Sequence, residues 1–562
     1  MKLRFPGNPG AAIATSKLGT GLAIFPRLVS FKGRRVTKLH DASKLSHCRP
    51  MSLLGVVTLV VTLACSSGGT NPATTIKGGT LNWATYSDAT GYDVQVNGSA
   101  VSWQYLWLVY EGLVELKDGI TVGPKLAQSW ERTSPTIYIF HLRTDAKFSN
   151  GRLLDADDVV TSFKRVLDPK NASTQRNFLG PIKTVAAVDS HTVRFELETT
   201  YDPFVDSLAM MRAAIIPGKE FLDGSFDPTK QMLGTGPFML KEHLPGQSFT
   251  FVRNPYYWRA GYPKVDQVVA KIYTDTSARL AALRNGTVDI ANFSNTDAPS
   301  QLQTVPNAKV VQQNTADYWN VDLNAVSPTS RVLNVKVRQA INMAIDRNQI
   351  ISLALGGVGT RVAPGPGSAD SCDVSTLPSS AHDLARARQL LSEAGATNLT
   401  MGLIALADYP QTVAIAQVIQ QNLKAIGITV NVEVLPLGEA SKRMLSGGFD
   451  GLMSFEATYT NPMFGLSYYE GKLPFTRNFA AIDPQLQSLI GQARQMGPGP
   501  ARKALFQQIC TLVDQNSNDL PLASRVEVIA SRSDKVQAKI PNREMADIPL
   551  RFIAEFTLVS PH

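Results

Sequence analysis

The residues that most often carry catalysis are scattered along this chain and form none of the common catalytic motifs. The sequence contains no HExxH, G-x-S-x-G, Walker or G-x-G-x-x-G motif. Asp157 and Asp158 are a conceivable acid pair, but adjacent side chains at a helix start do not converge on one substrate atom and instead suit helix capping. The histidines show no paired spacing and stand at His40, His47, His141, His191, His243, His382 and His562. We therefore predict no catalytic residue, no metal site and no cofactor.

The cysteines also lack the spacing of a metal site or a redox motif. They are Cys48, Cys65, Cys372 and Cys510. In an oxidising compartment Cys372 and Cys510 can form a disulfide, whereas two separate buried thiols fit the sequence equally well. Both alternatives stay open at this point.

Aromatic residues are the remaining candidates for a site, because their faces suit the lining of a ligand cleft. The same residues also fill hydrophobic cores, which is the more common role. The set comprises Tyr86, Trp103, Trp107, Tyr318, Trp319, Phe455 and Tyr459.

The positive charge of the chain is confined to its beginning. The formal net charge is +9, and residues 1–64 contain ten lysines and arginines but one acid, Asp41. The other residues hold 45 basic and 45 acidic side chains, so a nucleic-acid-binding role loses its main support. With 562 residues, the chain is long enough for two or three domains.

An apolar run precedes Cys65 and has the features of an export signal. Residues 51–64 carry no charge, and about 14 residues suit a signal peptide better than a membrane span. A Ser/Gly-rich tether follows Cys65. This order resembles a bacterial lipoprotein signal, with Cys65 as the lipidated residue. A plain secretory signal with a buried or paired Cys65 is the alternative.

One stretch, residues 126–167, organises the expected secondary structure. Thr136–Leu142 alternates β-branched and aromatic residues and predicts a strand that is covered on both faces. Ser149-Asn150-Gly151 is a turn signal. Asp155 stands at the N-cap of a helix in which Val159, Phe163 and Val166 form one apolar stripe.

The same stretch closely resembles the signature of the extracytoplasmic solute-binding proteins of ABC importers, in particular the large peptide/nickel-type family 5. That family has the elements W-E, F-x-L-R, x-F, G and D-V in this order. In this chain the corresponding residues are Trp130-Glu131, Phe140-His141-Leu142-Arg143, Lys147-Phe148, Gly151 and Asp158-Val159. Further matches are Val109–Leu113, Gly234–Phe238, Arg253–Trp258 and the helical stripe of Val335–Ile350. Gly234–Phe238 reads as a rigid turn with special backbone angles. The resemblance covers about residues 78–556.

Local patterns agree with an α/β fold. The patterns predict a strand at Leu399–Leu406, a helix at Thr412–Gly427 and a strand at Ile428–Leu435. A strand, a helix and a strand in this order are the elementary unit of an α/β lobe. Tyr318–Asn324 predicts a strand that crosses between lobes. The resemblance implies a two-lobed periplasmic-binding-protein-like fold (type II, large class with an extra subdomain) that has a hinge between its lobes.

The resemblance also implies domain boundaries. The expected segments are a leader at 1–64, a flexible tether at 65–77, the first part of lobe I at 78–110, an extra subdomain at 111–233, the second part of lobe I at 234–322, lobe II at 323–518 and the return to lobe I at 519–562.

The ligand residues implied by the resemblance are Tyr86, Trp103, Thr360, Arg361, Phe455, Thr458, Tyr459 and Asn461. Peptide-binding relatives have W-x-A-D-Y-P-D-P near the end of this set, and their first Asp pairs with the α-amine of the ligand. Phe455 stands here for the Trp, Thr458 for that Asp and Asn461 for the second Asp. Because a hydroxyl cannot supply the counter-charge of a buried ammonium, usual free-amine dipeptide binding is in doubt, and a neutral ligand, a capped ligand or a ligand that is cationic by another route stays open.

The implied function is to capture di- or oligopeptides in the cleft between the lobes and to deliver them to the permease of an ABC importer. The expected protein is a monomer anchored by lipid to the outer face of the cytoplasmic membrane, or periplasmic, with no nucleic-acid partner. The alternatives are the same fold binding an oligosaccharide or a metal chelate, a solute sensor, and a secreted hydrolase. The last would need a nucleophile–base pair, for which no motif is present.

Overall fold

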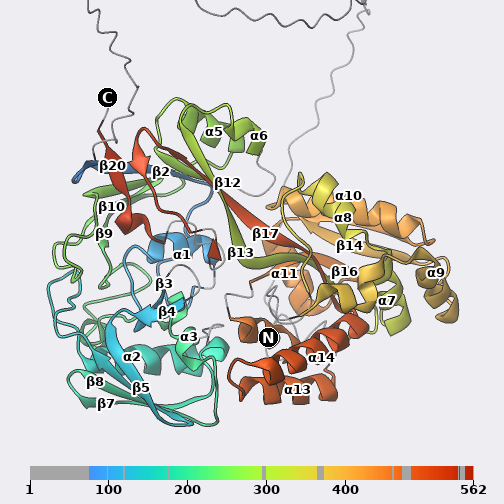
Figure 1. The fold of residues 1–562 in the computed structure, drawn as a ribbon, viewed down its shortest axis with the longest axis horizontal. Helices are drawn as coiled ribbons and strands as arrows, with labels where there is room; N and C mark the ends of the chain where they lie inside the picture. Colours follow the sequence, from blue (N-terminus) through green and yellow to red (C-terminus); the bar gives the residue numbers. More distant parts are fainter. Residues whose placement is uncertain are drawn as a thin grey trace, which may run out of the picture. The chain divides into compact units, whose positions relative to one another are not determined.

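The computed structural model describes residues 75–97, 99–117, 121–171, 173, 176–293, 299–363, 372–457, 461–470, 482–541, 543–544 and 551–560. These ranges belong to one compact unit, Asn71–His562. Within it, two lobes of mixed α/β structure share a central sheet (Figure 1). In the described ranges, every helix is too short or too polar to span a bilayer.

The central sheet runs through both lobes in the order β15-β14-β16-β13-β17-β12-β2-β11-β10-β9, and β19 pairs with β13. The strands are β2 (Thr80–Thr85), β9 (Phe238–Leu244), β10 (Ser248–Arg253), β11 (Gln267–Ile272), β12 (Ile290–Phe293), β13 (Ala308–Leu323), β14 (Thr400–Leu406), β15 (Thr429–Leu435), β16 (Gly451–Ala457), β17 (Asp519–Arg532) and β19 (Arg543–Glu544).

Two long antiparallel strands, β13 and β17, connect the lobes. Their first-lobe ends border β12, and their second-lobe ends border β16. The ladder between them is irregular at two points, between Asn314 and Tyr318 and between Trp319 and Asn320. The strand predicted at Tyr318–Asn324 is present, but it is the second-lobe end of a longer strand that begins ten residues earlier, at Ala308, and crosses between the lobes before Tyr318.

The first lobe packs around Trp83, Tyr105 and Phe249. It contains the sheet segment from β12 to β9 and a small sheet in the order β1-β20-β18. The further elements are β1 (Thr75–Ile76), β18 (Val536–Gln537), β20 (Thr557–Val559), α1 (Ala100–Leu106), α5 (Thr276–Arg284) and α6 (Pro299–Leu302).

The residues of the Gly234–Phe238 turn correct one expectation. Gly234 and Gly236 do not have positive φ angles. A Cβ atom on either would instead lie 2.2 Å or 2.6 Å from the carbonyl oxygen of Val109. Close backbone approach, rather than an unusual backbone angle, therefore requires glycine here.

The signature stretch lies in a subdomain of the first lobe with a four-stranded sheet in the order β5-β6-β8-β7 and a hairpin of β3 and β4. Its elements are β3 (Val114–Lys117), β4 (Thr121–Pro124), β5 (Ala127–Ser134), β6 (Ile137–Leu142), α2 (Ala156–Leu167), β7 (Ile182–Asp189), β8 (Thr192–Leu197), α3 (Phe204–Ser207) and α4 (Gly218–Leu222).

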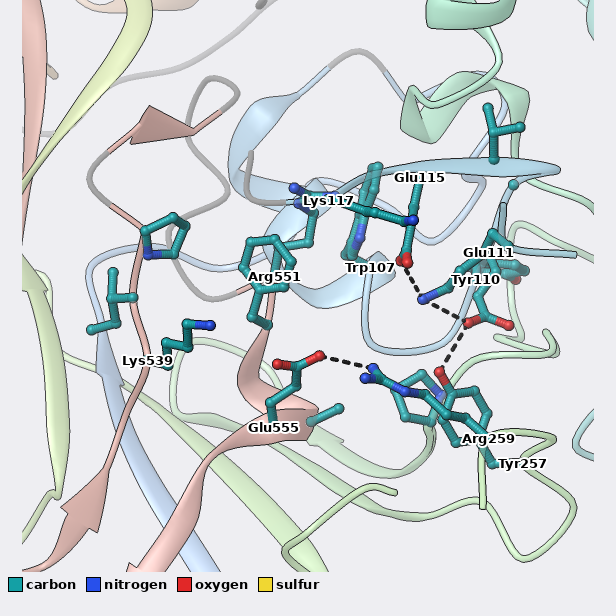
Figure 2. A pocket seen from close by; sticks show the side chains of 18 residues that line it. Trp107, Tyr110, Glu111, Glu115, Lys117, Tyr257, Arg259, Lys539, Arg551 and Glu555 are labelled. Atoms are coloured by element: carbon teal, nitrogen blue, oxygen red, sulfur yellow. Dashed lines mark hydrogen bonds and ion pairs between the residues drawn. The ribbon is translucent and has the colours of Figure 1, made fainter. Parts of the chain in front are cut away.

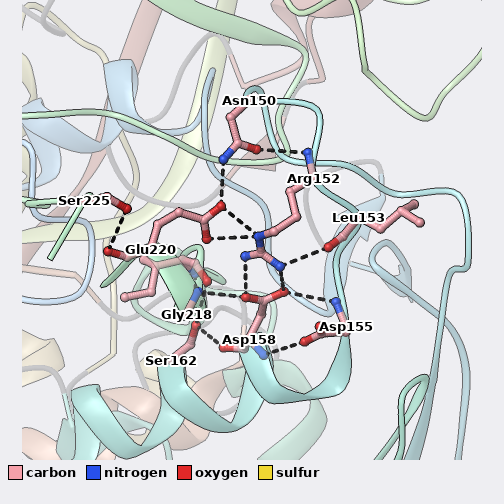
Figure 3. A network of polar contacts seen from close by, with 10 residues as sticks. Asn150, Arg152, Leu153, Asp155, Asp158, Ser162, Gly218, Glu220 and Ser225 are labelled. Atoms are coloured by element: carbon pink, nitrogen blue, oxygen red, sulfur yellow. Dashed lines mark hydrogen bonds and ion pairs between the residues drawn. The ribbon is translucent and has the colours of Figure 1, made fainter. Parts of the chain in front are cut away.

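Helix α2 begins where the sequence predicts. Asp155 and Asp158 form a capping box, and Val159, Phe163 and Val166 are buried. Figure 3 shows that Asp158 also binds the guanidinium of Arg152 through two short contacts, of 2.9 and 2.7 Å. The carboxylates at the helix start are thus structural.

Strand β6 corrects the expectation of a strand covered on both faces. Tyr138, Phe140 and Leu142 are buried, whereas Ile139 is half-buried and His141 is exposed. Both neighbours of β6 are antiparallel, and such a sheet buries one face while the other meets solvent. The apolar character of the outer face misled the pattern-based prediction.

The second lobe packs around Trp319, Ile341 and Leu403. The predicted strand–helix–strand unit is confirmed, because β14 and β15 pair in parallel and α10 connects them. The helices of this lobe are α7 (Val335–Ala344), α8 (Arg347–Gln349), α9 (Leu384–Glu393), α10 (Pro410–Lys424), α11 (Leu437–Ser446), α12 (Pro462–Gly465), α13 (Pro484–Arg494) and α14 (Pro500–Asn516).

The helical stretch expected at Val335–Ile350 is divided in the structure. Helix α7 ends at Ala344, and the side chain of Asp346 accepts hydrogen bonds from the backbone of Asn348 and Gln349, which starts α8. An N-cap inside the apolar repeat therefore interrupts the helix.

The two alternatives for Cys372 and Cys510 resolve into a disulfide. The Cα atoms lie 6.5 Å apart, and the bond closes a sequence separation of 138 residues. Cys510 lies in α14, and both cysteines belong to the buried hydrophobic cluster that includes residues of α13 and α14.

Candidate ligand-binding site

Strand β16 presents one predicted ligand residue and hides its neighbour, because successive side chains of a strand point to opposite faces. Phe455 is half-buried, while Glu456 is buried. In the antiparallel ladder with β13, Phe455 pairs with Trp319 and Glu456 with Tyr318. β16 therefore separates an aromatic surface from a buried acidic group.

Phe455 belongs to a cluster of three rings. Its ring lies 6.0 Å from Trp319 and 5.0 Å from Tyr409, both in edge-on arrangements. Trp319 is almost fully buried, whereas Phe455 and Tyr409 are partly accessible. Edge-on contacts of this kind hold the accessible ring of Phe455 in place.

A guanidinium lies against the same rings. The Cζ atom of Arg525, on β17, is 4.4 Å from the ring centre of Phe455 and 4.9 Å from that of Trp319. Its Nη1 atom makes an ion pair of 3.1 Å with the buried carboxylate of Asp317. Arg525 was not among the predicted ligand residues. The only sequence feature that points to Arg525 is its position as a charged residue among the mostly apolar residues of β17.

Thr360 lies beside this cluster. Its amide donates to Ser524 Oγ at 2.9 Å, and its carbonyl accepts from the amide of Ser524 at 2.8 Å. The exposed Thr360 therefore lies at the backbone of β17, one residue before Arg525. Arg361 turns away and donates to the carbonyl of Ser380 at 3.3 Å.

Asn461 caps helix α12 and also contacts the first lobe. Its side chain accepts a hydrogen bond from the amide of Met463. Burial raises the pKa of Asp206, in α3 of the subdomain, and a hydrogen bond with Asn461 acts in the opposite direction. Asn461 is thus placed where the second lobe meets the subdomain.

Other contacts join the second lobe to the subdomain at the same place. Arg502 of α14 forms an ion pair with Asp202, whose amide donates to the carbonyl of Arg494 at 3.0 Å. The guanidinium of Arg494 lies 5.8 Å from the ring centre of Tyr201. The two lobes therefore touch at a point distant in sequence from the strands that connect them.

Tyr86 and Trp103 lie in the first lobe. Tyr86 is half-buried in the loop after β2, with the guanidinium of Arg279 at 5.9 Å. Trp103 is 4 % exposed and donates from its indole nitrogen to the carbonyl of Asn97 at 2.9 Å. It packs in the core of the lobe, and its contact with ligand stays a prediction.

The structure thus brings Phe455 against Arg525 and places Thr360 beside Ser524, the preceding residue of β17. It places Asn461 at the contact with the subdomain, and Tyr86 and Trp103 in the first lobe. Thr458, Tyr459 and Cys65 lie outside the described residues. Aromatic faces, a guanidinium and backbone hydrogen-bonding groups are suited to noncovalent binding of a polar solute with apolar parts.

A separate cavity of about 650 Å³ lies in the first lobe (Figure 2). It is lined by Trp107, Tyr110, Glu111, Gly112, Val114, Glu115, Lys117, Lys125, Pro237, Tyr257, Arg259, Lys539, Ile540, Pro541, Arg551, Phe552, Ala554 and Glu555. None of the predicted ligand residues is among them.

Ion pairs occupy the charged groups on one side of this cavity. Lys125 lies 2.7 Å from Glu115 and 3.3 Å from Glu111, and Arg259 lies 2.8 Å from Glu555. Burial disfavours the charge of Lys125, but Tyr257 and the two carboxylates outweigh it and raise the pKa of this lysine. Its ammonium therefore stays protonated and bound to the carboxylates.

Comparisons with known proteins place the chain in one family. The family model for bacterial extracellular solute-binding proteins, family 5 (middle region), matches residues 121–475, more than half of the chain. Heme-binding protein A of Haemophilus influenzae is 29% identical over 458 residues, covering 74% of this chain and 82% of the relative. Di/tripeptide-binding protein 4 of Pseudomonas aeruginosa is 29% identical over 485 residues, covering 78% and 88%.

A solved structure agrees on the fold. The periplasmic binding protein AgaA of A. tumefaciens R10, in complex with agropinic acid, superposes with a TM-score of 0.77 at 24% identity. The match covers 86% of this chain and 99% of that one. These relatives are solute-binding proteins and not enzymes, and proteins of this family work outside the cytoplasm with the permeases of ABC importers. The chain belongs to the family 5 extracellular solute-binding proteins and is the solute-capturing component of an ABC importer.

Proposed function

We propose that this protein captures short peptides between its lobes and delivers them to its permease. The observation that carries the proposal is the surface formed by Phe455, Arg525 and Thr360. The partly accessible ring of Phe455 suits an apolar side chain, and the guanidinium of Arg525 holds that ring from its ion pair with Asp317. The exposed Thr360 offers a hydroxyl to a polar group. A relative with a di/tripeptide-binding name covers most of the chain, which supports the same class of solute.

The recognition of the peptide amine must differ from that in relatives with an aspartate at the position of Thr458. A hydroxyl accepts a hydrogen bond from an ammonium but does not neutralise its charge. We therefore expect N-acetylated peptides to bind at least as tightly as peptides with a free amine. A Thr458→Asp variant should reverse this order, because the new carboxylate attracts the ammonium.

The proposal is tested by native mass spectrometry of the purified protein, before and after mild unfolding. Release of a mixture of peptides supports the proposal. A single heme, metal chelate or opine-like species would overturn it. If no solute is released, calorimetric titration with N-acetylated tripeptides and with free-amine tripeptides tests whether the protein binds peptides. Absence of binding for both sets of tripeptides contradicts the proposal.

Two variants of Phe455 test the site itself. Phe455→Ala should weaken peptide binding about tenfold, because it removes the accessible aromatic face. Phe455→Trp keeps an aromatic face at this position and serves as the matched control. Equal affinities of the two variants would exclude Phe455 from the site.

We also propose that the mature protein is a monomer anchored through a lipid on Cys65. The support is the order of apolar run, small residue, cysteine and Ser/Gly tether in the sequence. Cys65→Ala should move the protein from the membrane fraction to the soluble fraction. Unchanged membrane association would contradict the lipid anchor.

A further inference from the structure

Three buried carboxylates converge on the side of β16 opposite to Phe455. They are Asp322 of β13, Glu456 of β16 and Asp519 of β17, which lie on adjacent strands of the central sheet. Their residues are 1%, 4% and 4% exposed. One carboxylate oxygen from each lies within 4.8 Å of the corresponding oxygens of the other two.

Hydrogen bonds hold two of the three groups. The amide nitrogen of Asn320 donates to Asp322 Oδ1 at 3.0 Å and to Asp519 Oδ1 at 2.9 Å. The hydroxyl groups of Tyr318 and Tyr469 donate to Asp519 Oδ2. These contacts fix Asp322 and Asp519 in orientation.

Glu456 differs from the other two. Its carboxylate makes no hydrogen bond or ion pair with any residue that the structure describes, and its Oε2 atom is fully buried. The Oδ1 atom of Asn320 is also buried without a partner. Buried polar atoms nearly always have a partner, so two such atoms at one place indicate a missing one.

Positive charge near the cluster is insufficient for three carboxylates. Among the described residues, none forms an ion pair with Asp322, Glu456 or Asp519. The charge of Arg347 acts on Asp519. Its guanidinium, however, donates to the carbonyl of Pro521 and to the side chain of Asn342. A cluster of this kind requires either bound protons or a cation.

We propose that Asp322, Glu456 and Asp519 bind a hard divalent cation of the size of calcium. Two oxygens on one ion lie no farther apart than twice the metal–oxygen distance, which is about 4.6–5.2 Å for calcium and about 4.2 Å for magnesium. The three oxygens lie within the span of one calcium ion, and calcium accepts irregular sets of protein oxygens, whereas magnesium keeps an octahedral shell that usually contains several waters. One such ion, together with Arg347, balances the charge of the three carboxylates.

Asn320 offers a fourth ligand. Rotation of its amide by half a turn gives up the hydrogen bonds to Asp322 and Asp519 but turns the unpartnered oxygen toward the same place, and amide oxygens are good calcium ligands. The ion would then connect the three strands β13, β16 and β17 directly behind Phe455. It would stiffen the strand that carries the proposed binding surface.

The test uses the purified protein after dialysis against EDTA and measures terbium luminescence, because terbium replaces calcium and is excited by nearby tyrosines. We expect luminescence sensitised through Tyr318 and Tyr469 and quenched by calcium, together with one calcium per protein by elemental analysis. Glu456→Gln keeps the shape of the side chain but removes its charge, and should weaken calcium binding about 100-fold. Glu433→Gln, an exposed change on β15, which β14 separates from β16, is the matched control and should bind as the wild type does.

Three results would overturn the proposal. The first is unchanged calcium binding by Glu456→Gln, which would place the ion elsewhere. The second is absence of binding by the wild type at about 1 mM calcium, judged by both luminescence and thermal unfolding. The third is stronger binding of magnesium than of calcium. Circular dichroism of each variant shows that it is folded, so that loss of binding is not loss of structure.

Discussion

Asp158 connects three segments of the subdomain through one carboxylate. It receives two hydrogen bonds from Arg152, one from the amide of Asp155 and one from the amide of Gly218. Burial raises the pKa of Asp158, and the hydrogen bonds from Arg152 and Asp155 oppose that effect. The residue that the sequence identified as a family signature is thus a structural anchor.

Asp158→Asn should lower the free energy of unfolding by about 3 kcal/mol, because it removes the buried one of the two carboxylates that bind the guanidinium of Arg152 and leaves Glu220 alone to pair with it. Asp157→Asn is the control. Asp157 is exposed one position earlier in the same helix, and its change should alter stability by less than about 0.5 kcal/mol. Urea unfolding of both variants measures the difference. Equal losses would contradict the anchoring role.

The acidic cluster predicts an unusual pH dependence in EDTA. Burial, and then the charges of Asp519 and Asp322, raise the pKa of Glu456 well above its usual range. The folded protein therefore retains a proton that the unfolded chain releases above about pH 4.3, so the free energy of unfolding falls as the pH rises from there toward neutrality.

Glu456→Gln should flatten this fall, by up to about 1.4 kcal/mol per pH unit, and should stabilise the metal-free protein at neutral pH. Thermal unfolding between pH 4 and 8 measures the slope. Glu433→Gln is again the control and should retain the slope of the wild type. A slope unaffected by Glu456→Gln would mean that this carboxyl is ionised in the folded state.

At the scale of elements, the sequence predicts most strands and helices because their patterns are local. Helix α2 and the β14–α10–β15 unit follow from caps and apolar spacing within a few residues. The irregularity of the β13–β17 ladder between Asn314 and Tyr318 cannot be predicted from local patterns, because it depends on the pairing with β17, which lies about two hundred residues away in the sequence. The position of Arg525 over Phe455 also depends on the pairing of strands that are far apart in the sequence, and local patterns do not predict it.

The contact between α14 and the subdomain should affect solute binding without touching solute. Arg502→Ala removes the ion pair with Asp202 and should weaken affinity about three- to tenfold, because it destabilises the arrangement in which the lobes touch. Lys503→Ala changes an exposed neighbour in the same helix and should leave affinity unchanged. Calorimetric titration measures both. Equal affinity of Arg502→Ala and the wild type would show that this contact does not contribute to binding.

At the scale of the whole molecule, family motifs predict the two-lobed fold because they recur in order along most of the chain. The site is predicted less completely. The residues of the proposed site come from β16, β17 and the loop at Thr360, and sequence alone does not give the contacts of Arg525 with Phe455 or of Thr360 with Ser524. The disulfide cannot be predicted from sequence alone either, because its two cysteines are 138 residues apart and no local pattern connects them.

Loss of this disulfide should lower stability substantially. Cys510→Ser, or reduction of the wild type, should decrease the free energy of unfolding by about 2–5 kcal/mol, because the bond restricts a long loop in the unfolded chain. Thermal unfolding with and without dithiothreitol measures the effect. The variant is the internal control, since reductant should not destabilise it further. Insensitivity of the wild type to complete reduction would contradict the expectation.

The ladder of β13 and β17 makes the link between the lobes elastic. Since these strands are hydrogen-bonded to each other from one lobe to the other, the lobes cannot swing about a single freely rotating bond. Any change in their angle must twist a ribbon of two strands, whose natural twist sets the resting angle. The free energy needed to twist β13 and β17 thus contributes to the affinity for solute, even through residues of these strands that do not contact the solute.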